Sequence, residues 1–205
     1  MAAALVVLAT SSYWFLADRH AVDRALLLGL ADPSGSPEFE GAFVSVAWSF
    51  TALGSPEVVF VFAAAMTLFF ALSSRWIETV HTVASIAGGA AAGYAAKAVT
   101  GLVRPHHAPG SSELLHTSFP SGHALLATLL FGTAAVLAAR RCKRLHLQSY
   151  LVATAAGISL AVGVSRVYLG THWPSDVLAG WSFGLIWILL VDAGRARLRV
   201  RPNSV

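Results

Sequence analysis

Residues 120–139 read PSGHALLATLLFGTAAVLAA, and the architecture can be worked out from this stretch. After Gly122 and His123 it is an almost unbroken apolar run, close to the roughly 20 residues that a helix needs to cross a bilayer. Proline is favoured in the first turn of a helix, and glycine lets the backbone approach a ligand closely. The stretch therefore predicts a membrane-spanning helix over residues 122–139 that begins at a polar tetrapeptide.

Similar apolar segments occur on both sides of this helix. The chain is 56% hydrophobic and only 12% charged, which argues against a water-soluble domain. Residues 1–16 lack the charged start and clear cleavage site of a signal peptide, so they are interpreted as a short membrane helix, although a truncated start would also explain the missing charge. The sequence predicts an all-α, polytopic membrane bundle of about six transmembrane helices, forming a single domain over residues 1–205. The expected spans are residues 1–16, 57–72, 79–99, 122–139, 149–169 and 176–192.

The basic residues indicate topology. The formal net charge is +4, which might suggest binding to nucleic acid, but most of the cations fall on one predicted side of the membrane. Cytoplasmic loops of membrane proteins carry an excess of Lys and Arg, so this side is expected to face the cytoplasm and no nucleic-acid partner is expected. The cations concerned are Arg75, those of residues 140–144, Arg195, Arg197, Arg199 and Arg201.

Two further patterns concern packing. Apolar residues recur at helical spacing over residues 39–53, which predicts an amphipathic helix at the outer interface that either guides a lipid or packs over the bundle. Gly89 and Gly93 form a Gly-x-x-x-Gly pair, which lets helix backbones approach closely in lipid. Packing within one bundle is the simpler interpretation of the pair, and a dimer interface is the alternative.

Polar residues that are costly near a bilayer occur in three clusters, all predicted at the outer ends of spans. The cations are Lys97, Arg104 and Arg166. Arg can hold two phosphate oxygens in a fork and Lys acts as a point charge, so together they would neutralise a phosphoryl group. Lys97 and Arg104 could instead extend to the interface without a specific role. Arg166 is harder to explain in that way because it lies inside an apolar segment.

The second cluster is the tetrapeptide that precedes the central span. A helix N-terminus presents free N–H groups and a partial positive charge, which makes it an anion site. Ser121 and the Gly122 amide are therefore expected to contact phosphate oxygens, with His123 beside them. The alternative is that the tetrapeptide only starts a helix.

The third cluster contains a candidate nucleophile. Asp176 follows His172 by four residues, in the first turn of the predicted last span, and could reach one imidazole nitrogen. A carboxylate there fixes the tautomer and leaves the other nitrogen free as a nucleophile. Taken alone, the pair is better explained as a capping acid and a surface histidine.

The three clusters in this order, Lys-x6-Arg-Pro, Pro-Ser-Gly-His and Ser-Arg-x5-His-x3-Asp, resemble the signature of the type 2 phosphatidic acid phosphatase superfamily. The resemblance spans residues 97–176. It implies that His172 attacks phosphorus to give a phosphohistidine, that Asp176 orients it, and that His123 protonates the leaving oxygen. It further implies that the phosphoryl oxygens are bound by Lys97, Arg104, Ser121, Gly122 and Arg166. No metal or other cofactor is implied.

The expected activity is thus hydrolysis of a lipid phosphate or diphosphate at the outer face of the cell membrane. Undecaprenyl pyrophosphate is the first candidate from the resemblance, followed by phosphatidylglycerophosphate, phosphatidic acid and lipid A phosphates. A lipid phosphotransferase and a non-catalytic lipid-binding or transport protein are the alternatives. Oligomeric state stays open, and so does the role of His106, His107 and His116 in the loop between the first two clusters.

Overall fold

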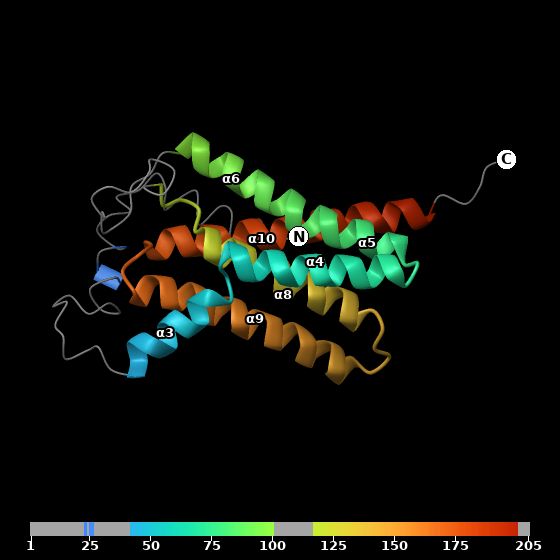
Figure 1. Ribbon diagram of the computed structural model, residues 1–205, viewed down its shortest axis with the longest axis horizontal. Coiled ribbons are helices and arrows are strands. Elements are labelled where there is room, and N and C mark those ends of the chain that lie inside the picture. Colours follow the sequence, from blue (N-terminus) through green and yellow to red (C-terminus); the bar gives the residue numbers. More distant parts are fainter. Residues whose placement is uncertain (1–22, 24, 27–41, 101–116, 201–205) are drawn as a thin grey trace.

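The protein is a bundle of helices in the computed structural model, which describes residues 23, 25–26, 42–100 and 117–200 (Figure 1). The predicted span at residues 1–16 lies outside the described residues. The elements, in chain order, are α3 (Ala42–Ala52), α4 (Pro56–Leu72), α5 (Trp76–Val83), the π-helix η2 (Ala84–Gly88), α6 (Gly89–Thr100), α8 (Gly122–Ala139), α9 (Leu145–Tyr168) and α10 (Pro174–Val200).

The helices match the predicted spans closely, and the all-helical membrane fold is confirmed. Among the described residues α8, α9 and α10 are each long and apolar enough to cross a membrane. A fourth span results if α3 and α4, which meet at an angle of 43°, are taken together. α5, η2 and α6 follow one another without a break and cover the predicted span at residues 79–99. The total of six transmembrane helices stays a prediction.

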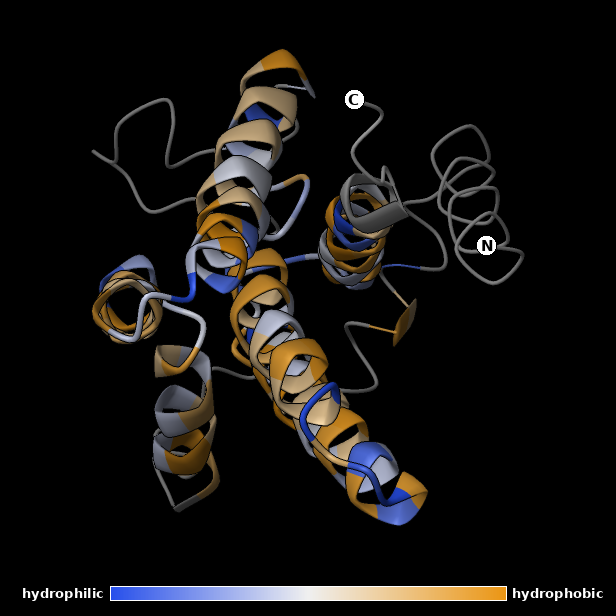
Figure 2. Ribbon diagram, turned by 90° about the vertical axis from the view of Figure 1, so that its right-hand side faces the viewer, coloured by the Kyte–Doolittle hydropathy of each residue, from blue (hydrophilic) through white to orange (hydrophobic). Residues whose placement is uncertain are grey.

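α8 forms the centre of the bundle. It packs against α9, α10, α4 and α6, and Ala124, Ala127 and Leu129 on it are completely buried. The outer faces are apolar as well: Phe60 on α4 and Leu190 on α10 are 74% and 62% exposed. Figure 2 shows hydrophobic residues along most of each helix and hydrophilic ones mainly at turns and helix ends. Helices that are apolar on both faces are typical of a bundle whose outer surface contacts lipid.

The glycine pair packs inside the bundle, as expected. A Cβ atom at Gly89 would lie 2.6 Å from Leu129 Cδ2, and one at Gly93 would lie 2.1 Å from Leu125 Cδ2. Both leucines belong to α8. The small residues therefore let α6 approach the central helix closely.

A turn of π-helix, η2, joins α5 to α6. A π-turn shifts the hydrogen-bond ladder by one residue and leaves a carbonyl in need of a donor. Here the indole Nε1 of Trp187 on α10 donates a hydrogen bond to the Ala84 carbonyl oxygen at 3.0 Å. α10 thus supports the continuous helix α5–η2–α6 at the point where its helical register changes.

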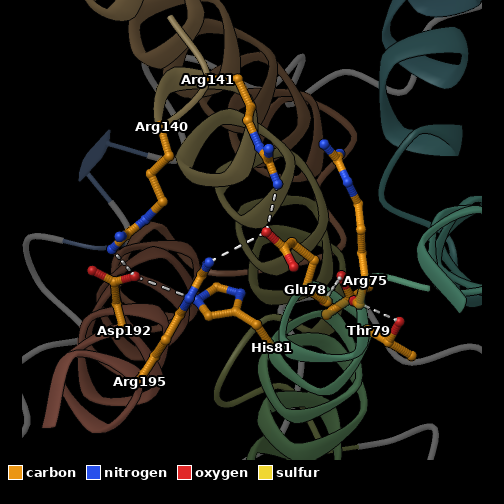
Figure 3. Close-up of polar contacts among 9 residues, drawn as sticks. Arg75, Glu78, Thr79, His81, Arg140, Arg141, Asp192 and Arg195 are labelled. Atoms are coloured by element: carbon orange, nitrogen blue, oxygen red, sulfur yellow. Dashed lines mark hydrogen bonds and ion pairs between the residues drawn. The ribbon is translucent and has the colours of Figure 1, made fainter. Parts of the chain in front are cut away.

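Charged residues gather at the end of the bundle where α5, α8 and α10 meet (Figure 3). Arg141 donates a hydrogen bond to Glu78 Oε1 at 2.6 Å, and Arg195 lies 3.5 Å from the same oxygen. Asp192 pairs with Arg140 and with His81, whose Nε2 lies 3.4 Å from its Oδ1. Pairing offsets the cost of charges at the edge of a membrane. This cluster joins the three helices at one end of the bundle. The starts of α8 and α10 lie at the opposite end.

Candidate active site

Four helix ends meet at the other end of the bundle, and each carries part of the predicted site (Figure 1). These are the C-terminal ends of α6 and α9 and the N-terminal ends of α8 and α10. The convergence predicted from sequence is therefore observed for the described residues. They are Lys97, Ser121, Gly122, His123, Arg166, His172 and Asp176. Arg104, His106, His107 and His116 lie outside the described residues.

His172 and Asp176 form a buried pair. Their side chains are 1% and 0% exposed, and His172 Nδ1 lies 3.5 Å from Asp176 Oδ2. The same oxygen accepts a hydrogen bond from the Trp173 amide at 3.0 Å, so the carboxylate also caps the start of α10. Capping and contact with the imidazole were alternative interpretations of the sequence, and one carboxylate does both. A carboxylate at Nδ1 would leave Nε2 as the nitrogen available for chemistry.

The start of α8 is joined directly to this pair. The Ser121 amide donates a hydrogen bond to the Asp176 carbonyl oxygen at 2.9 Å. The helices come this close because Gly180 on α10 has no side chain: a Cβ atom there would lie 2.7 Å from the Ser121 carbonyl oxygen. Ser121 is completely buried, and its Oγ has no hydrogen-bond partner among the described residues. Gly122 has open space at its Cβ position. A hydroxyl and helix-terminal amides in such a place suit an anionic oxygen.

Two cations complete the described part of the site. Arg166 is 6% exposed, and its Nη1 donates a hydrogen bond to Thr51 Oγ1 at 3.1 Å. Its carbonyl oxygen accepts from the amides of Thr171 and His172, at 3.1 and 3.3 Å, so the backbone of Arg166 also holds the turn that carries the candidate nucleophile. Lys97, on α6, is 7% exposed. Both cations are buried near helix ends at the same end of the bundle as the start of α8, where positive charge could help to hold a phosphoryl group.

Several residues that support the site could not be singled out from the sequence. Thr51, at the end of α3, contacts Arg166 across 115 residues of chain. Gly54 follows in the α3–α4 turn, where a Cβ atom would lie 2.6 Å from the His123 carbonyl oxygen. Thr100 Oγ1 donates a hydrogen bond to the Phe119 carbonyl oxygen at 2.8 Å, which ties the end of α6 to the approach of α8. None of these residues belongs to a recognisable short motif, so only the fold identifies them.

The part of the chain that the structure describes holds no group of three or more His, Cys, Asp and Glu side chains able to bind a metal ion. The described site residues instead offer two cationic side chains, two imidazoles and one carboxylate.

The family model of the PAP2 superfamily matches residues 78–198, which is more than half of the chain. The chain belongs to the PAP2 superfamily. The match contains all three motif clusters and runs from α5 to the end of α10.

Curated relatives support the same family. Phosphatidylglycerophosphatase B of Bacillus subtilis is 41% identical over 93 residues, covering 43% of this chain and 44% of the relative. A lipid A 1-phosphatase of Rhizobium johnstonii is 33% identical over 132 residues, covering 60% and 49%. An undecaprenyl-diphosphatase of Sulfolobus acidocaldarius is 38% identical over 103 residues, covering 47% and 44%. The chain thus spans about half the length of the curated relatives it matches.

A solved structure resembles nearly the whole chain. It is the crystal structure of a transmembrane PAP2-type phosphatidylglycerolphosphate phosphatase from Bacillus subtilis, with a TM-score of 0.74 and 25% identity, and 96% of each chain is covered. Together with the apolar helices, this likeness identifies the protein as a membrane protein.

Proposed function

We propose that this protein is a membrane lipid phosphatase that hydrolyses a phosphate mono- or diphosphate ester of a lipid through a phosphohistidine intermediate. The observation that carries the proposal is the buried His172–Asp176 pair, joined by the Ser121 amide to a helix N-terminus. Phosphoryl transfer depends mainly on positioning and on neutralising the phosphoryl oxygens. A nucleophile, an orienting acid and an anion site in one place provide both.

The proposed reaction has two steps. His172 Nε2 attacks phosphorus while Asp176 stabilises the imidazolium that forms, and the bond from phosphorus to the leaving oxygen breaks. His123 donates a proton to that oxygen. In the second step His123 takes a proton from water, the water oxygen attacks phosphorus, and the P–N bond breaks to release phosphate. The phosphoryl oxygens are held by Lys97, Arg104, Ser121, the Gly122 amide and Arg166.

An apolar groove supports a lipid as the substrate. It has a volume of about 570 Å³ and lies between α4 and the continuous helix α5–η2–α6, with Leu126 of α8 also lining it. Two of its lining residues lie at the end of the groove nearest the candidate site. Pro56 lies two residues after Gly54, which packs on the backbone of His123. Tyr94 lies one helical turn before Lys97. A hydrocarbon chain in this groove would place its phosphate near the cations.

The charge distribution supports the orientation in the membrane. Arg75 precedes α5, Arg140 and Arg141 follow α8, and Arg195 lies in the C-terminal part of α10, all at the end of the bundle opposite the site (Figure 1). Figure 3 shows these side chains. By the positive-inside rule that end faces the cytoplasm. We therefore infer a multi-pass protein of the cell membrane whose site faces the extracytoplasmic side, with residues 1–205 acting as one domain.

Phosphate release from a lipid panel tests the function. The purified protein in detergent is given undecaprenyl diphosphate, phosphatidylglycerophosphate, phosphatidic acid, a lipid A 1-phosphate and, as a lipid-free control, glycerol 3-phosphate. We expect release from at least one lipid with a kcat/KM well above that for glycerol 3-phosphate. Release only from glycerol 3-phosphate, or from none of the compounds, would contradict the proposal. The first candidates are the polyprenyl diphosphate and the phospholipid phosphates, in keeping with the names of the relatives.

Filling the groove should separate lipid from soluble substrates. Ala64 lines the groove, whereas the adjacent Ala65 is exposed and does not line it. Ala64→Trp is expected to lower kcat/KM for the lipid by about tenfold, which corresponds to roughly 1.4 kcal/mol of lost binding. Hydrolysis of a small soluble ester by the same variant should stay within about twofold of the wild type.

Ala65→Trp is the matched control, since it adds the same indole next to the groove rather than in it. Equal losses in the two variants, or an equal loss on the soluble ester, would show that the lipid chain does not bind there.

A further inference from the structure

A buried carboxylate from the N-terminal part of the chain contacts the start of α10. Asp23 is 1% exposed and lies 152 residues before its partner, Ser175. Its Oδ1 accepts a hydrogen bond from the Ser175 amide at 3.0 Å, and its Oδ2 accepts one from Ser175 Oγ at 2.5 Å. Both oxygens of the carboxylate therefore bind one residue of another segment.

Ser175 lies in the first turn of α10, between Pro174 and Asp176. The first amides of a helix have no partner inside the helix. Here Pro174 has no N–H, the Trp173 amide donates to Asp176 Oδ2, and the Ser175 amide donates to Asp23. One amide of the turn is thus satisfied from within the turn and another by a residue far away in sequence. Carboxylates near a helix N-terminus are also favoured by the helix dipole.

The contact bears directly on the candidate nucleophile. His172 and Asp176 meet only through the fold of this short turn, with the nitrogen and oxygen 3.5 Å apart. Ser175 is adjacent to Asp176, whose carbonyl oxygen accepts from Ser121. The turn is therefore held on one side by α8 and on the other by Asp23. A displacement of about 1 Å at a reacting group can cost on the order of 100-fold in rate.

We propose that Asp23 is a positioning residue for the reaction, and that it acts through Ser175 to fix the turn carrying His172 and Asp176. The inference rests on the proposed phosphohistidine chemistry. Both hydrogen bonds of Asp23 that we observe go to Ser175. Neither goes to a described motif side chain that would hold the phosphate. Its loss should consequently lower kcat and leave substrate binding largely intact.

Substitutions at position 23 should have graded effects. Alanine leaves the Ser175 amide and hydroxyl buried without their acceptor, which is the costly way to lose a hydrogen bond. Asparagine keeps the shape, can accept from the amide through its oxygen, and can donate to Ser175 Oγ through its nitrogen. Asp23→Asn should therefore recover most of the activity that Asp23→Ala loses.

The experiment uses the full-length protein in detergent with p-nitrophenyl phosphate, a soluble ester that does not depend on the lipid groove. We expect Asp23→Ala to lower kcat by about 100-fold with KM within about threefold of the wild type. The double variant with Ser175→Ala should lose little more than Asp23→Ala alone, because both changes remove the same contact. The control is Leu26→Ala, in the same short helical segment, where the side chain is 43% exposed and activity should not change.

The outcomes separate the inference from the function on which it rests. If the wild type is active and Asp23→Ala has the same kcat, the positioning role alone is overturned. The same holds if the fold-losses of Asp23→Ala and Ser175→Ala multiply in the double variant. A wild type that releases no phosphate from any ester would overturn both. Melting temperatures identify variants that do not fold. If Asp23→Ala does not fold, Asp23→Asn and Ser175→Ala are measured in its place. Wild-type activity in both of these variants would refute the positioning role.

Discussion

Replacing His172 with alanine is expected to reduce phosphate release by on the order of 10⁴-fold, because the reaction then has no nucleophile. His172 is buried with Asp176 at the start of α10, and no other imidazole is placed against that carboxylate among the ion pairs of the described residues. The loss should appear in kcat, for the lipid and for a small soluble ester alike. The protein should fold normally, since the change removes a side chain next to a turn that Asp23, Ser121 and Arg166 still hold.

The phosphohistidine intermediate can be measured directly by trapping it on the protein. A phosphorus–nitrogen bond survives alkaline quenching and is lost in acid, so the wild type quenched in alkali should carry label from a labelled substrate. The His172→Ala variant should carry none. His146→Ala is the matched control, because that histidine is exposed at the opposite end of the bundle, and it should behave as the wild type. Label retained by His172→Ala, or near-normal phosphate release, would refute covalent catalysis at this residue.

The second largest effect is expected for His123→Ala. General acid–base catalysis contributes about 10²- to 10⁴-fold, so lipid hydrolysis should fall by about 10³-fold. The size of the loss should depend on the leaving group. A lipid alcohol leaves poorly without a proton, whereas p-nitrophenolate leaves as an anion and needs no acid.

Pre-steady-state kinetics can separate the two roles of His123. With p-nitrophenyl phosphate, His123→Ala should still give a burst of p-nitrophenolate, one per protein molecule, because phosphorylation of His172 proceeds without an acid. Turnover after the burst should be slow, since the general base for the attacking water is missing. An equal loss of the first step for lipid and aryl esters would mean that His123 does not protonate the leaving oxygen. Parallel measurements on His146→Ala control for the effect of losing an imidazole elsewhere.

Much of this protein was predictable from the sequence because the bilayer imposes a simple rule. A helix in lipid must satisfy its own backbone and present apolar side chains over about 20 residues. The predicted span at residues 122–139 coincides with α8, and the segment at residues 57–72 differs from α4 by one residue. The described members of the three clusters lie on helix ends at one end of the bundle, while their roles in catalysis stay a prediction.

The same sequence gave no sign of the contacts that support the site. Thr51, Asp23 and Gly54 are ordinary residues at unremarkable spacings. Each becomes relevant only through a contact made by the fold: Thr51 with Arg166, Asp23 with Ser175, and Gly54 with the backbone of His123. No sequence pattern pairs His81 with another residue, yet its Nε2 lies 3.4 Å from Asp192 Oδ1 in the charged cluster where α5, α8 and α10 meet. The π-turn at Ala84–Gly88 likewise depends on Trp187, a residue of another helix.

The helices and the candidate site residues could thus be predicted from the amino-acid sequence, because hydrophobicity and motif spacing act over short stretches of chain. The residues that contact Arg166 and the His172–Asp176 turn, and the apolar groove beside α4, became visible only in the folded protein. Those features arise between segments up to 152 residues apart. Their geometry follows from how the helices pack, a property that no short stretch of sequence contains.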